Sequence, residues 1–143
     1  MRLIGIDPGG RFIGLAICDA HGLAARPLST LTHVSRDVDI AALIATAREQ
    51  EAEGFVIGFA IQADGTPAPQ GVSAQKLAEA LREASGLPVW LHDEWGSSRE
   101  GLRRMIEAGK RRRARREQQH AAAAAAILQS YLDATARETP QGE

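Results

Sequence analysis

Two acidic segments and one histidine stand where folding could bring them together. Asp7 closes the apolar run Leu3–Ile6, Asp93 and Glu94 follow a later apolar run, and His120 begins an alanine-rich segment. A carboxylate at the end of a buried strand is costly unless a cation or a donor accompanies it. Carboxylate oxygens and an imidazole nitrogen are ligands for Mg²⁺, Mn²⁺ or Zn²⁺. The three segments predict a divalent-metal site; the alternatives are a turn-capping Asp7, a solvated acidic loop and a surface histidine.

A second chemical signal is a dense positive segment. Residues 110–116 read KRRRARR, with six positive charges in seven residues: Lys110, Arg111, Arg112, Arg113, Arg115 and Arg116. Like charges at this density repel one another unless an anion neutralises them, and the phosphate backbone of nucleic acid is such an anion. A solvated linker between two helices is the alternative. Trp95 could stack on a base or pack as a lid, and the pattern favours neither.

Composition limits the class of protein. The chain has 143 residues, 44% of them hydrophobic and 24% charged, which suits one soluble domain. We expect a single domain over residues 1–137 and a frayed tail over 138–143. Cys18 is the only cysteine, so an intramolecular disulfide is excluded and a reducing, cytoplasmic location is expected. No apolar run approaches the length of a membrane span, and the net charge of −1 gives no overall basic signal.

Turn signals and periodicity arrange these residues on an α/β fold with a mixed, five-stranded sheet. Two apolar runs, 3–6 and 12–17, flank a glycine-rich turn and predict a β-hairpin whose second strand is buried on both faces. A third strand over 23–31 contains Pro27 and is therefore placed at the sheet edge. Alternating helices and strands follow, which implies parallel pairing through crossovers. The predicted elements are a helix over 37–52 capped by Ser35 and ended by Gly54, a strand over 55–59, a loop over 62–70, a helix over 72–84, a strand over 87–91, and helices over 97–109 and 118–136.

This order of elements would gather the candidate residues at one edge. Sites in open α/β sheets form where the carboxyl ends of parallel strands meet. In the last helix His120, Ala124, Ile127 and Tyr131 share one stripe by their spacing. If Ile127 faces the sheet, His120 faces it too, and can approach Asp7.

Four segments in this order resemble the YqgF-like (RuvX-type) family of Holliday-junction resolvases and pre-16S rRNA nucleases, which has the ribonuclease-H-like fold. They are Gly5–Ala16, Val56–Gly65, Leu91–Ser98 and His120–Leu132. The chain departs from the family pattern at three positions: Ala60 replaces Pro, Trp95 replaces Arg, and His120 replaces Asp.

The resemblance implies a metal-dependent nuclease with Asp7, Glu94 and His120 as metal ligands and catalytic residues. Arg11, Trp95 and the basic residues of 110–116 would bind RNA or branched DNA, with no membrane partner, as a monomer or homodimer. The cofactor would be Mg²⁺ or Mn²⁺, and His120 favours Mn²⁺ because Mg²⁺ prefers oxygen ligands. One alternative is a catalytically impaired nucleic-acid-binding relative. A phosphotransferase of the actin and sugar-kinase type is another, although such enzymes clamp nucleotide between two domains.

Overall fold

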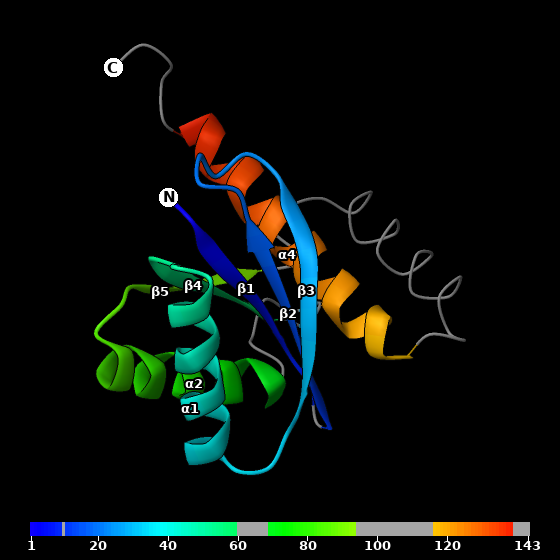
Figure 1. The fold of residues 1–143 in the computed structure, drawn as a ribbon, viewed down its shortest axis with the longest axis vertical. Helices are drawn as coiled ribbons and strands as arrows, with labels where there is room; N and C mark the ends of the chain where they lie inside the picture. The colour runs from blue at the N-terminus through cyan, green and yellow to red at the C-terminus, as the bar shows by residue number, and fades with distance from the viewer. Residues whose placement is uncertain (10, 60–68, 94–115, 139–143) are drawn as a thin grey trace.

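The computed structural model describes residues 1–9, 11–59, 69–93 and 116–138 (Figure 1). Its elements in chain order are β1 (Leu3–Pro8), β2 (Phe12–Cys18), β3 (Ala25–Thr32), α1 (Arg36–Glu49), β4 (Gly54–Phe59), α2 (Pro69–Ser85), β5 (Val89–Asp93) and α4 (Arg116–Glu138). The predicted helix over 97–109 lies outside the described residues. In the part of the chain that is described, no helix is long and apolar enough to cross a membrane.

The five strands form one mixed sheet in the order β3-β2-β1-β4-β5. β1, β2 and β3 pair antiparallel, whereas β4 and β5 continue the sheet parallel to β1. The predicted α/β class, with three antiparallel strands followed by αβαβ, is confirmed. Because β1, β4 and β5 run in the same direction, their carboxyl ends meet at one edge of the sheet.

Side chains alternate between two cores, one on each face of the sheet. Ile4, Ile6 and Phe55 belong to the core that α1 and α2 cover. Leu3 and Val56, which point to the other face, pack against α4. Figure 1 shows α1 and α2 on one side of the sheet and α4 crossing the other. Since β2 is buried along nearly its whole length between these layers, the prediction that both its faces are buried is confirmed.

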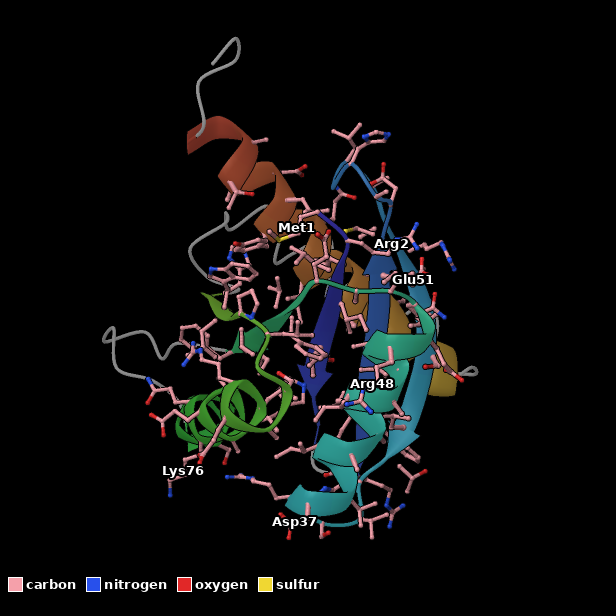
Figure 2. All side chains as sticks on the ribbon, turned by 60° about the vertical axis from the view of Figure 1, so that its left-hand side comes forward. Met1, Arg2, Asp37, Arg48, Glu51 and Lys76 are labelled. Carbon is pink, nitrogen blue, oxygen red and sulfur yellow. The ribbon has the colours of Figure 1, made fainter. Side chains whose placement is uncertain are left out.

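Local sequence signals predicted most features of the elements in the first half of the chain. Ser35 caps α1 and its hydroxyl accepts a hydrogen bond from the Val38 amide at 3.3 Å. Pro27 lies on the edge strand β3, where the register against β2 shifts between Leu15 and Ala16, as expected for a proline at a bulge. The predicted end of α1 at Gly54 is wrong, because α1 ends at Glu49. Figure 2 labels Arg48, the residue before that end. Glu51, with φ of 55°, turns the chain away.

The boundaries of other elements also differ from those predicted. β5 covers Val89–Asp93 rather than 87–91, so Asp93 is the last residue of the strand and does not follow it. α2 starts at Pro69, within the predicted loop, and α4 extends two residues further at each end than predicted. Arg116, the last residue of the basic segment, therefore starts α4. These shifts leave the order of elements unchanged and move the carboxyl end of β5 closer to Glu94 in the chain.

Candidate active site

Asp7 lies near the carboxyl end of β1, opposite Gly14 of β2, and on the face of the sheet that α4 covers. Its carboxyl keeps some exposed surface. Burial raises the pKa of Asp7 above its ordinary value, and the nearby His120 partly opposes this shift. Within the described residues, no donor hydrogen-bonds to the carboxylate. Asp7 therefore carries an electrostatic cost that a bound cation would offset.

His120 approaches Asp7 because two glycines let α4 lie directly on the sheet. A methyl group at Gly14 would lie 1.9 Å from the His120 carbonyl oxygen. One at Gly5 would lie 2.7 Å from Leu128 Cβ and 2.9 Å from the Ala124 carbonyl oxygen. Only residues without a Cβ tolerate so close an approach. The distance between the start of α4 and the end of β1 is thus determined by glycines inside strands.

Packing along α4 also holds the imidazole. Ala124 and Ile127 are buried against the sheet, which confirms the predicted inner stripe, while His120 and Tyr131 lie half-buried at its ends. The His120 ring packs on Phe12, with centroids 5.3 Å apart and planes tilted by 38°. The structure therefore brings together Asp7 and His120, two of the three predicted metal ligands.

The other predicted site residues are only partly placed. Arg11 is exposed in the turn between β1 and β2, and its carbonyl accepts a hydrogen bond from the His33 amide at 2.9 Å. It thus lies at the same edge as Asp7. Glu94, Trp95 and residues 110–115 lie outside the described residues, and of Arg116 only the backbone in α4 is described.

The register shows where the chain enters the segment that contains Glu94. Ile6 pairs with Ile57, and Ile57 pairs with Leu91, so β1 and β5 end at similar heights. One strand separates them, which corresponds to roughly 10 Å at the usual strand spacing. Asp93, the last residue of β5, therefore lies at the same edge as Asp7, and Glu94 is the next residue in the sequence.

The sequence interpretation missed the contacts of three residues near this edge. Phe12 was assigned only to a strand, although it supports the His120 ring. His92 points to the α4 face, where its Nε2 lies 2.9 Å from Ser130 Oγ and its ring meets Tyr131 edge-on. Gly14 carried the one usable signal, because a glycine inside an apolar strand indicates close approach of another backbone.

The described donors fit part of a metal site. A desolvated carboxylate and an imidazole nitrogen offer one hard and one borderline ligand. Within the described ranges no group of three His, Cys, Asp or Glu side chains is close enough to hold an ion. A third side-chain ligand would have to come from outside the described ranges, where Glu94 follows Asp93 in the sequence.

The sequence matches the model of the family described as "RuvX: Holliday junction resolvase" over residues 1–134. The chain belongs to the RuvX family. Among curated relatives, one from Anaeromyxobacter sp. (strain Fw109-5) is 41% identical over 133 residues, covering 93% of this chain and 97% of its own. One from Myxococcus xanthus (strain DK1622) is 37% identical over 134 residues, with 94% and 89% covered. Both carry the name "Putative pre-16S rRNA nuclease".

Solved structures place this RuvX chain in a wider fold group. Thermus thermophilus RuvC in complex with a Holliday junction substrate superposes with a TM-score of 0.68 at 18% identity, covering 97% of each chain. The fowlpox virus resolvase with Holliday junction DNA gives 0.58 at 11% identity, covering 94% and 99%. At these identities the likeness establishes the fold alone. The predicted ribonuclease-H-like fold is confirmed.

Proposed function

We propose that this RuvX protein is a metal-dependent nuclease that hydrolyses phosphodiester bonds in nucleic acid. The observation that carries the proposal is the desolvated Asp7 carboxylate beside His120, at the sheet edge that leads to Glu94. The names of the curated relatives favour pre-16S rRNA as substrate. The family description favours Holliday junctions as a second one.

Asp7, Glu94 and His120 are the residues we propose to hold the metal and to act in catalysis. A divalent cation bound there would supply a more acidic water and charge neutralisation at the phosphate. The imidazole makes Mn²⁺ a better fit than Mg²⁺, because Mg²⁺ prefers oxygen ligands. Proximity of a cation would also favour the ionised form of Asp7, reversing the effect of burial on its pKa.

The protein's own residues would orient these ligands. Phe12 restricts the tilt of the His120 ring, and the α4 backbone is seated on Gly14. Arg11, exposed at the same edge, would contact the phosphate backbone. We also propose that Trp95 and the basic residues of 110–116 bind the substrate strand, in a cytoplasmic monomer or homodimer.

The test compares cleavage of labelled single-stranded RNA, duplex DNA and a four-way DNA junction with Mg²⁺ and with Mn²⁺. Asp7→Asn keeps the shape of the side chain and removes its charge, so cleavage should fall by orders of magnitude while the protein stays folded. Asp133→Asn is the matched control, because Asp133 is exposed on α4. If wild type binds nucleic acid but cuts none of the three substrates, the protein is instead an impaired binding relative.

A further inference from the structure

A cavity of about 590 Å³ lies on the face of the sheet opposite to His120. Pro8 and Gly9 line it from the end of β1, directly after Asp7, and it extends to α1 and α2. Figure 2 labels Asp37 on α1 and Lys76, which points outward from α2; these two helices supply part of the lining of the cavity. The candidate active site and this cavity therefore share one strand end, from which they open to opposite faces.

The apolar part of the cavity is made by Pro8, Ile13 and Leu77, which come from three different elements. Such a surface suits the face of a ring. A volume near 600 Å³ is within the ~300–1,000 Å³ range of sites for small organic molecules and is ample for one nucleotide unit.

The polar part is dominated by His33, which Asp39 holds in place. The Asp39 side chain is only 7% exposed, whereas that of His33 is 45% exposed. Asp39 Oδ2 is hydrogen-bonded to His33 Nδ1, and Asp39 Oδ1 accepts the Val34 amide at 3.0 Å. Because an ionised carboxylate only accepts, Nδ1 carries the proton. The second ring nitrogen is left without a partner among the described residues.

Charge in the cavity is balanced rather than strongly positive. Arg36 adds one cation, Asp39 supplies one anion, and the hydroxyls of Ser35 and Ser73 add neutral donors and acceptors. A bare phosphate would find little excess positive charge here. A base that stacks on an imidazole and on apolar side chains, with its edge meeting hydroxyls, matches the lining better.

We propose that this cavity accepts an unpaired nucleotide of the substrate strand, adjacent to the phosphate that is cleaved. The proposal rests on the proposed nuclease function and narrows its substrate. A base paired inside a duplex cannot stack on a protein side chain unless it leaves the helix. Strands that are single-stranded next to the cut are therefore the preferred substrates, and fully paired DNA is not.

The test measures binding without cleavage, in EDTA, with short RNA strands that carry 2-aminopurine at one position at a time. Stacking quenches this base, so wild type should quench strongly at one or two adjacent positions. His33→Gln keeps an amide donor for Asp39 and removes the ring. It should abolish the quenching there and weaken binding by roughly 5- to 150-fold, the range for one lost base stack. His21→Gln, in the exposed turn after β2, should change neither.

A second pair of variants covers the possibility that His33→Gln destabilises the fold. Ser73 and Gln75 are both exposed on α2, but only Ser73 lines the cavity. Ser73→Glu should remove the quenching at the same position, whereas Gln75→Glu adds the same charge and should not. Equal quenching at every position, or quenching unaffected by both cavity variants, would overturn the proposal. If a free 2-aminopurine nucleotide is quenched as strongly, the cavity binds single nucleotides, and the proposal that it binds a nucleotide within a strand is overturned.

These outcomes are distinguishable from failure of the nuclease proposal. Asp7→Asn should lose cleavage yet keep the position-dependent quenching, because Asp7 faces α4 and not the cavity. If wild type shows the quenching but cleaves nothing, the nuclease proposal fails, and the cavity is a binding site for an unpaired nucleotide with no cleaved phosphate beside it. If wild type cleaves but His33→Gln and Ser73→Glu bind like wild type, the cavity proposal alone fails.

Discussion

Replacement of Gly14 by alanine should separate the geometry of the site from the stability of the fold. The added methyl group would lie 1.9 Å from the His120 carbonyl oxygen and 2.3 Å from its carbon. Side-chain Cβ atoms essentially never approach other heavy atoms within 3.0 Å. Both partners are backbone atoms, so no rotamer change relieves the clash. The start of α4 must move outward by about 1 Å, carrying His120 away from Asp7.

Gly14→Ala should cause a moderate loss of stability and a much larger loss of activity. Overpacking of this sort costs about 1–3 kcal/mol, and for a domain of this size each 1 kcal/mol lowers Tm by roughly 3–4 °C. Ala124, Ile127 and Leu128 stay buried further along α4, so the fold should survive. A displacement of about 1 Å at a catalytic group can cost about 100-fold in rate. Gly14→Ala should therefore lose about two orders of magnitude in kcat/KM while unfolding cooperatively.

Gly54→Ala is the matched control. Its methyl group would lie 2.9 Å from Trp90 Cζ3 and 3.0 Å from the Pro88 carbonyl oxygen. Those clashes are at the start of β4, the end of the strand opposite to the site. Gly54→Ala should lower Tm while leaving kcat/KM within a few-fold of wild type. If Gly14→Ala retains wild-type kcat/KM, the contact between Gly14 and α4 does not position His120 for catalysis, and the reasoning fails.

Three further predictions concern charge. Burial raises the pKa of Asp7, so the metal-free folded protein binds the proton of this carboxyl more tightly than the unfolded chain does. The free energy of unfolding therefore falls as the pH rises above the ordinary Asp pKa near ~3.9. Asp7→Asn should raise Tm in EDTA at pH 7, and this increase in Tm should vanish at acid pH. Protonated imidazole cannot bind a cation, so acidification should weaken Mn²⁺ binding, as measured by calorimetry. His120→Asp should reduce the preference for Mn²⁺ over Mg²⁺. An unchanged preference would contradict ligation of the metal by His120. Replacing Arg111, Arg112 and Arg113 by Gln should flatten the log–log salt dependence of single-strand binding by about 0.7 per lost phosphate contact; an unchanged slope and affinity would show a solvated linker.

Local sequence signals predicted the elements well because each acts within a few residues. The glycine-rich turn, the Ser35 cap and the edge position of Pro27 all depend on neighbours in the chain. The end of α1 was wrong because a left-handed Glu51 ends the helical path, and glutamate carries no signal for that conformation.

The site was harder to predict because it depends on contacts between distant segments. The stripe on the last helix placed His120 on the correct face, but the closeness of α4 follows from Gly14, more than a hundred positions earlier in the chain. The pair of His33 and Asp39 spans a connector and the first turn of α1, where the sequence showed only a link between two elements. Residues that act through tertiary approach leave weak local patterns, so these were the ones missed.

The two faces of the sheet give a reason for the place of Asp7, one residue before the end of β1. Its neighbours Pro8 and Gly9 already line the cavity on the other face, while Asp7 points toward α4. Alternation along a strand sends consecutive side chains to opposite faces, so two adjacent residues can serve two sites. A nucleic-acid strand lying over the end of β1 would have a phosphate on the face of the sheet with Asp7 and an unpaired base on the face with His33. The turn at Gly9, held by its amide hydrogen bond of 3.0 Å to the Phe12 carbonyl, would thereby fix the spacing between cleavage and base recognition.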